Sequence, residues 1–319
     1  MGGGEVRKQA KSVFEMIELL KQRGLTIDVP DMPGILLDNN YYRLSAYFRP
    51  FQKDPANGDN DFRPGAKVSD FLTPFMLDDQ FRRLILEGTS RLELTLRARL
   101  AYNLALNGDA YNYDEPDSYR DIAYPNGMLK RDALISNIKG WVSRSHEVCI
   151  RHYRHQHEQP PVWAVVEVLP FDTLSKMLQL HLDMDAVAKT VLSLGLCKNR
   201  RRASEIVHAM VYLRNLCSHH SRLWNREMVI TPAVLKDMRA AFPEFAYEDK
   251  SVGNSLIVLM YLVDRINGDR EYSHRILDFL AQDDSYRHGI LHPLHWDWSR
   301  DNSKDRDWSA NHLGCVYAI

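Results

Sequence analysis

The segment from residue 198 to residue 226, KNRRRASEIVHAMVYLRNLCSHHSRLWNR, holds the densest group of side chains that could do chemistry. Seven cations face one acid, Glu205, in a chain whose formal net charge is only -1. Because phosphate is the usual partner of an arginine-rich face, this imbalance indicates phosphate binding. A solvated helical face is the alternative that the charges alone leave open. The cations are Lys198, Arg200, Arg201, Arg202, Arg214, Arg222 and Arg226.

Arg214, Asn215 and His219 have the residue types of a catalytic group. On an ideal helix, residues five apart are rotated by roughly 140°, so Arg214 and His219 do not share a face. One face instead runs from Asn215 through His219 to the two later arginines, at spacings of four, three and four residues. A long arginine side chain could reach round, or the helix could end before His219. Either layout favours a site that a second copy of the motif completes.

The elements that must position this segment are predicted to be helices, because helical periodicity dominates the chain. A capping-box pattern, Ser12 followed three residues later by Glu15, opens the first helix, which closes on Gly24. No run alternates apolar and polar residues between turns, so the predicted fold class is all-α. The expected helices cover residues 12–24, 78–107, 130–153, 163–182 with a break at Pro170, 204–220, 232–242, 251–267 and 273–281.

Three regions are predicted along the chain. Residues 1–65 form an N-terminal helical region with an aromatic block at 39–51, expected to be mostly core, and a loop at 53–65. Residues 66–230 form a helical core that carries the motif. Residues 231–319 form a C-terminal helical extension, which ends after Asp283 in a polar, poorly periodic tail rich in His and Trp.

Composition narrows the class of protein. The 319 residues are 45% hydrophobic and 26% charged, values that exclude wholesale disorder. The near-neutral charge excludes a generic polybasic coat for nucleic acid. The longest apolar run, residues 256–263, is far short of the ~20 residues that a membrane span needs, and no secretory signal is evident. With four scattered cysteines and no C-x-x-C pair, the sequence predicts a cytoplasmic protein with reduced thiols and no zinc finger.

Two other groups are weaker candidates for chemistry. His152, His155 and His157 fall in an expected loop with few carboxylates nearby, so an exposed segment is favoured over a metal site. Cys217 is two residues from His219, a spacing that directs the two side chains apart on a helix. No metal is therefore expected, and Cys217 is not expected to be a nucleophile.

Several blocks of the chain together resemble the Abi-like family of bacterial abortive-infection proteins, the AbiD/AbiF group within the HEPN superfamily of helical ribonucleases. The spacing of Arg214 and His219 is weak by itself, since Arg202 and His208 also fit it. The resemblance rests on ordered blocks: ELLKQRGL, NNYYRLSAYFRPF, LDDQFRRLILEGTSRLELTLRARLAYNLA, PPVWAVVEVLPFDTLSKML and RNLCSHHSRLWNR. One departure is Phe171-Asp172, where the family usually has Phe-Gly.

The resemblance implies a HEPN-type helical bundle and a metal-independent ribonuclease without a cofactor. It implies that Arg214, Asn215 and His219 are catalytic, with His220 as a polar neighbour. RNA carries its own nucleophile, the 2′-OH, so His219 would move a proton and Arg214 would stabilise charge on phosphorus. Asn215 would orient the histidine or bind a phosphate. The expected products are a 2′,3′-cyclic phosphate and a 5′-hydroxyl.

The resemblance also gives roles to residues outside the motif. HEPN sites pair two motifs across a helical interface, and this chain has one extended motif, so a homodimer is expected. Glu93 and Arg97 form either a simple surface pair or a support for Arg214. The expected phosphate-binding residues are Arg200, Arg201, Arg202, Arg222 and Arg226.

The function that follows is an endoribonuclease that acts as an abortive-infection effector or toxin. Its expected partners are substrate RNA and a small structured RNA that restrains it, with a protein antitoxin as the second candidate for the restraint. The alternative is a non-catalytic RNA-binding module of a defence or toxin–antitoxin system. A protein-interaction scaffold is the third possibility.

Overall fold

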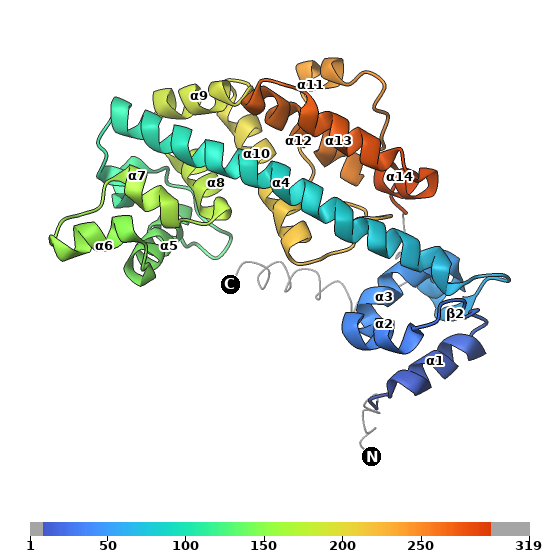
Figure 1. The fold of residues 1–319 in the computed structure, drawn as a ribbon. Coiled ribbons are helices and arrows are strands. Elements are labelled where there is room, and N and C mark those ends of the chain that lie inside the picture. The colour runs from blue at the N-terminus through green and yellow to red at the C-terminus, as the bar shows by residue number, and fades with distance from the viewer. Residues whose placement is uncertain (1–8, 295–319) are drawn as a thin grey trace. The chain divides into compact units, whose positions relative to one another are not determined.

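The computed structural model describes residues 9–294, in which nearly all of the regular secondary structure is helical (Figure 1). The all-α prediction is confirmed for this part of the chain. The described residues up to Leu77 form one compact unit, and Asp78–Pro293 form a second. The helix α4, Val68–Asn107, contributes its first ten residues to the first unit and the rest to the second. Short 3-10 turns occupy Arg49–Phe51, Pro55–Asn57, Asn112–Asp114, Pro116–Ser118 and Val166–Val168.

The first unit contains the helices α1 (Val13–Gln22), α2 (Met32–Asn39) and α3 (Tyr41–Phe48). The predicted capping box is present at α1: Ser12 Oγ accepts a hydrogen bond from the Glu15 N–H, and the Glu15 carboxylate accepts one from the Ser12 N–H. The aromatic block supplies much of the core, since Tyr47 and Phe48 are buried. Tyr42, by contrast, is exposed.

A small hairpin lies where the sequence predicted only a loop. Its strands β1 (Gln52–Asp54) and β2 (Asp59–Phe62) pair antiparallel, with Gln52 opposite Phe62. The prediction of no sheet is wrong at this place. Strands of three and four mostly polar residues are too short to show an alternating pattern. The Phe62 N–H donates to the Arg23 carbonyl and so ties β2 to the end of α1.

Helix α4 is the longest element of the protein, and its second part is central to the second unit. It begins ten residues earlier than predicted, with Pro74 inside it. Apolar residues at helical spacing along it are buried, including Phe81, Leu92 and Leu96. At Gly88 a Cβ atom would lie 2.2 Å from the Tyr272 hydroxyl, so glycine is needed for the close approach of that ring.

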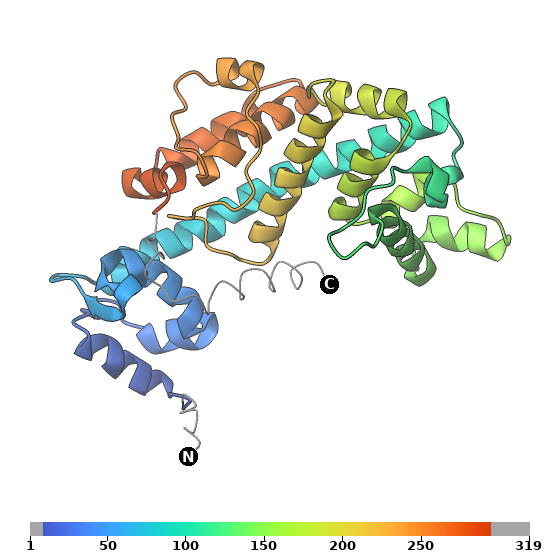
Figure 2. The same cartoon turned by 180° about the vertical axis from the view of Figure 1, so that it is seen from behind.

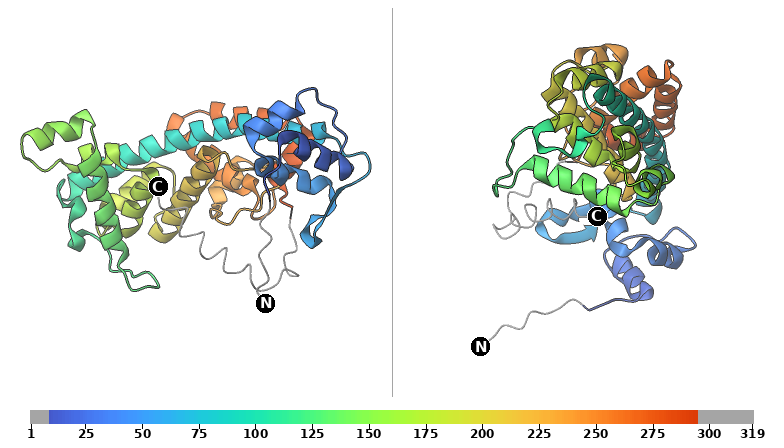
Figure 3. Two further views of the ribbon diagram at one scale, coloured as in Figure 1. Left: turned by 90° about the horizontal axis from the view of Figure 1, so that it is seen from below. Right: turned by 90° about the vertical axis from the view of Figure 1, so that its left-hand side faces the viewer.

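Helices α5 (Lys130–Arg144), α6 (Val148–His155), α7 (Val162–Val165) and α8 (Phe171–Leu180) gather near the Asn107 end of α4 (Figure 3). The single helix predicted over 130–153 is wrong, because the chain turns at residues 145–147. Arg154 closes this corner by donating to the carbonyls of Val142, Ser143 and Ser145. The predicted break at Pro170 is confirmed.

The remaining helices are α9 (Met184–Ser193), α10 (Arg200–Ser218), α11 (Lys236–Ala241), α12 (Val252–Asn267), α13 (Glu271–Leu280) and α14 (Asp284–Leu291). Helix α10 crosses α4 (Figure 2), and α13 contacts α4 through the Tyr272 hydroxyl, which donates to the Leu84 carbonyl. Helices α9 and α14 were not predicted. The region after Asp283 was expected to lack periodicity, yet Asp283 caps α14, whose Tyr286 and Ile290 are buried.

The rest of the His- and Trp-rich tail, from residue 295, lies outside the described residues. Within residues 9–294, no helix combines the length and the apolar character that crossing a bilayer requires.

Candidate functional site

The Arg–His motif lies at the C-terminal end of α10. The helix ends at Ser218, and His219 caps it with its N–H directed at the Asn215 carbonyl, 2.9 Å away. The next two N–H groups turn back: His220 donates to the Cys217 carbonyl and Ser221 to the Leu216 carbonyl. This is a Schellman ending, in which His220 takes the left-handed position that usually holds glycine, with φ of 52°. The imidazole of His219 is therefore presented at an exposed helix end.

Because α10 stops before His219, the single helical face through Asn215, Arg222 and Arg226 does not form. This outcome matches the alternative in which the helix ends early. Arg222 and Arg226 instead lie in the segment that follows, where the Arg226 guanidinium donates to the Arg222 carbonyl at 3.1 Å. Both side chains are half-buried and remain near the motif in the chain.

Arg214 is held in place from α4. Its Nη2 lies 3.9 Å from the Glu93 Oε2, and the other oxygen of this carboxylate accepts a 2.9 Å hydrogen bond from Arg97 Nη2. The guanidinium carbon also lies 5.9 Å from the centre of the Phe171 ring, within reach of a cation–π contact. Glu93 thus contacts both arginines and is not paired with Arg97 alone; its support of a catalytic Arg214 stays a prediction. The Arg214 side chain is one quarter exposed, which leaves part of it open to a ligand.

The segment after His220 is anchored by a buried carboxylate, Asp78. The side chain of Asp78 is fully buried and accepts hydrogen bonds from the N–H groups of Leu223 (2.7 Å) and Trp224 (3.1 Å). The Tyr286 hydroxyl donates to the same carboxylate at 2.7 Å. Arg82 completes the group, with Nη1 3.9 Å from Asp78 and 3.3 Å from the Ser221 carbonyl.

This group fixes the chain immediately after the two histidines. The N–H groups of a chain leaving a helix need acceptors, and a buried carboxylate supplies strong charge-assisted ones. Asp78 and Tyr286 were not predicted from the sequence as supports of the motif. Asp78 lies about 145 positions from the loop it holds, so no local pattern connects the two.

Cys217 is not available for chemistry. Burial raises the pKa of its thiol well above the usual range, so the side chain is a protonated thiol inside the core. This agrees with the expectation that it is no nucleophile. Within the described residues, Cys149, Cys197 and Cys217 are all free.

The other predicted phosphate-binding residues lie far from His219. Arg200, Arg201 and Arg202 form the first turn of α10, and a helix of this length places that turn about 27 Å from Ser218. The structure therefore separates the predicted cations into one group beside the motif and one at the opposite end of the same helix.

The histidines of residues 152–157 do not form a metal site. His152 and His155 lie on α6, so the predicted loop is wrong at this place, and His157 follows the helix at a φ of 57°. Residues 9–294 contain no group of three or more His, Cys, Asp or Glu side chains placed to hold a metal ion.

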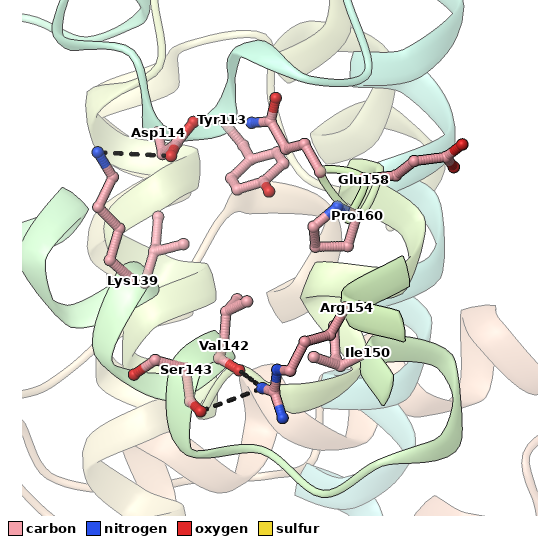
Figure 4. A pocket seen from close by; sticks show the side chains of 11 residues that line it. Tyr113, Asp114, Lys139, Val142, Ser143, Ile150, Arg154, Glu158 and Pro160 are labelled. Atoms are coloured by element: carbon pink, nitrogen blue, oxygen red, sulfur yellow. Dashed lines mark hydrogen bonds and ion pairs between the residues drawn. The ribbon is translucent and has the colours of Figure 1, made fainter. Parts of the chain in front are cut away.

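A cavity of about 290 Å³ opens between α5, α6 and the segment near Tyr113 (Figure 4). Lys139 pairs with Asp114 at 3.5 Å on one side, and Arg154 caps the end of α5 on the other. Burial raises the pKa of Tyr113 to about 12. The cations that line this cavity are already occupied by partners of the same chain, so it contributes nothing to the motif.

The second unit is thus an all-α protein unit with an arginine–histidine motif at an open helix end. The sequence profile of the family described as Abi-like protein matches residues 34–225, a range that includes Arg214, Asn215 and His219. The chain belongs to this Abi-like protein family, and membership indicates a function in abortive infection. No match was found among curated proteins or among solved structures.

Proposed function

We propose that this protein is a metal-independent endoribonuclease of HEPN type that acts as an abortive-infection effector. The observation that carries the proposal is a cation and an exposed imidazole at the same helix end: Arg214, which contacts Glu93 of α4, lies five residues before His219, the C-cap of α10. A fixed guanidinium stabilises charge that builds on a phosphoryl group, and an imidazole titrates near neutral pH. Family membership supports the same reading.

The reaction needs two proton transfers. A base removes the proton from the 2′-OH, the 2′-oxygen forms a bond to phosphorus, and the bond from phosphorus to the 5′-oxygen breaks. An acid gives a proton to that leaving oxygen, so the products are a 2′,3′-cyclic phosphate and a 5′-hydroxyl. Arg214 stabilises the phosphoryl oxygens, and Asn215 orients the imidazole or binds phosphate.

One histidine does not readily serve as both base and acid in a single in-line displacement. A second copy of the chain supplies the second His219, so the active form is a homodimer whose motifs face each other. The exposed position of His219 at the end of α10 leaves it accessible to such a partner. His220, Arg222 and Arg226 extend the basic character beside the motif.

Cleavage in the presence of a chelator tests the proposal. The purified protein should cut single-stranded RNA in excess EDTA and leave 2′,3′-cyclic phosphate and 5′-hydroxyl ends, read by mass spectrometry. RNA of the same sequence with 2′-O-methyl groups is the matched control and should stay intact, because its nucleophile is blocked. Cleavage of the methylated RNA, or products with 3′-hydroxyl ends, would contradict the mechanism.

The restraint on this activity is proposed to be a small structured RNA, with a protein antitoxin as the second candidate. RNA that binds a basic surface tightly should co-purify with the chain at low salt and dissociate as salt rises. The absorbance ratio at 260 and 280 nm of the purified protein, followed by sequencing of the bound nucleic acid, should reveal one discrete RNA. Protein free of nucleic acid would exclude tight RNA restraint and direct the search to a protein antitoxin.

A further inference from the structure

A second cavity, lined by basic residues, lies at the opposite end of α10 from His219. Its volume is about 390 Å³, and its lining includes Arg120, Asn199, Arg200, Arg201 and Ser204. No aspartate or glutamate is among the lining residues in the part of the chain that the structure describes. Three guanidinium groups therefore border a cavity without an acid in its wall.

Two of these arginines are positioned by the fold. Arg120 follows Tyr119, which forms an antiparallel bridge with His181, and the Arg120 N–H donates to the Leu180 carbonyl at 2.9 Å. Arg200 reaches the same strand-like segment and donates to the His181 carbonyl at 3.0 Å. Partial burial, and then the nearby charge of Arg120, lowers the pKa of Arg200. The Arg120 backbone and the Arg200 guanidinium are thus both bound to the segment 180–181, and neither contact neutralises a charge.

The placement of the arginines also opposes the helix dipole. The N-terminal end of a helix carries partial positive charge and favours anions, yet α10 begins with three consecutive arginines and has no acid in its first turn. Asn199 Oδ1 accepts from the Arg202 N–H, while the N–H groups of Arg200 and Arg201 belong to the same open turn. Arg201 is partly neutralised by Glu205, at 2.9 Å on the exposed side. An anion in the cavity would offset the remaining repulsion between the arginines and the positive end of the helix dipole.

The buried hydroxyl of Ser204 indicates that the cavity binds a hydrogen-bonding ligand. Ser204 lines the cavity, is only 3% exposed, and its Oγ has no hydrogen-bond partner among residues 9–294. A buried hydroxyl without a partner is costly, and such groups in native proteins commonly bond to a ligand or to water. The hydroxyl, the helix end and the arginines supply donors of the kinds that bind phosphate oxygens.

We infer that this cavity is a binding site for a terminal phosphate group, carried either by a free nucleotide or by the end of an RNA chain. The Arg120 and Arg200 guanidinium groups would hold the phosphate oxygens, with further hydrogen bonds from the Ser204 hydroxyl and from N–H groups of the first turn of α10. Its place about one helix length, roughly 27 Å, from His219 makes it a separate subsite. The inference does not depend on RNA cleavage.

Calorimetric titration of the full chain with inorganic phosphate tests the site. Phosphate should bind, and Arg120→Gln should weaken it by about tenfold, because one charge-assisted contact is lost. Arg202→Gln is the matched control: Arg202 was expected from the sequence to bind phosphate, yet it is exposed and lies outside the cavity wall, so its loss removes one arginine charge nearby without removing a lining residue. It should change the affinity less than twofold. Ser204→Ala keeps every charge and should weaken phosphate severalfold.

The outcomes separate the two sources of phosphate. A 2′-O-methyl RNA cannot be cleaved through its 2′-oxygen, so it reports binding whether or not the protein is a nuclease. Tighter binding of this RNA with a 5′-phosphate than with a 5′-hydroxyl assigns the site to an RNA end, whereas tighter binding of AMP than of either RNA assigns it to a nucleotide. Absence of phosphate binding at millimolar concentration overturns the inference, as do equal effects of Arg120→Gln and Arg202→Gln together with an unchanged affinity in Ser204→Ala.

Discussion

His219→Ala is expected to lower the rate of RNA cleavage by about 10²–10⁴-fold while leaving RNA affinity nearly unchanged. The substitution removes the imidazole that moves the proton but none of the cations that bind phosphate. His219 is the exposed cap of α10, and its backbone N–H bond to Asn215 does not depend on the side chain. The thermal midpoint should therefore stay close to that of the wild type.

Cleavage should be measured under single-turnover conditions, with affinity taken from fluorescence anisotropy on 2′-O-methyl RNA. His274→Ala is the matched control, since His274 is an exposed histidine on α13 outside the motif. A loss of cleavage in proportion to a loss of affinity would indicate that His219 only contacts phosphate. Undiminished cleavage in His219→Ala would falsify its catalytic role. If His219→Ala lowers neither cleavage nor RNA affinity in preference to the other, the result would favour the non-catalytic RNA-binding module.

The sequence predicted the helical class and the position of the motif because both are local properties. The stripe through Phe81, Leu92 and Leu96 repeats at helical spacing, and its residues are buried as that pattern requires. The capping box at Ser12 is equally local, since its two hydrogen bonds join residues three apart. The break before α8 follows from the missing N–H of Pro170.

The sequence alone did not determine where α10 ends, because the residue that terminates the helix is unusual for that position. A Schellman ending generally has glycine in the left-handed position, and here His220 occupies it. The backbone bonds that return to Leu216 and Cys217 set the end of the helix, not a residue type that marks it. The separation of Arg200 from His219 follows once the full length of α10 is known.

The supports of the motif could not be predicted because they come from distant parts of the chain. Glu93 reaches Arg214 from α4, and Tyr286 reaches Asp78 from a helix that the sequence analysis did not predict. The hydrogen bond between Tyr286 and Asp78 joins residues 208 positions apart. Only the packing of α4, α10 and α14 brings these groups together.

Asp78→Ala is expected to lower the free energy of unfolding of the second unit by about 3–5 kcal/mol. The change removes one buried carboxylate that accepts hydrogen bonds from Leu223, Trp224 and Tyr286. It leaves the buried guanidinium of Arg82 without its fully buried counter-charge, and buried donors without acceptors are costly. Because the released segment begins directly after His220, the same variant should lower RNA cleavage at temperatures where the unit remains folded.

Urea unfolding followed by tryptophan fluorescence measures the effect, since Trp224 is buried beside Asp78. Asp79→Ala is the matched control: the neighbouring carboxylate also pairs with Arg82, at 3.3 Å, but it is 41% exposed. Exposed ion pairs contribute little, so Asp79→Ala should cost no more than about 1 kcal/mol. Equal losses of unfolding free energy in the two variants would mean that the burial of Asp78 adds nothing to stability. A stable Asp78→Ala protein with full activity would show that the segment after His220 holds its conformation without this carboxylate.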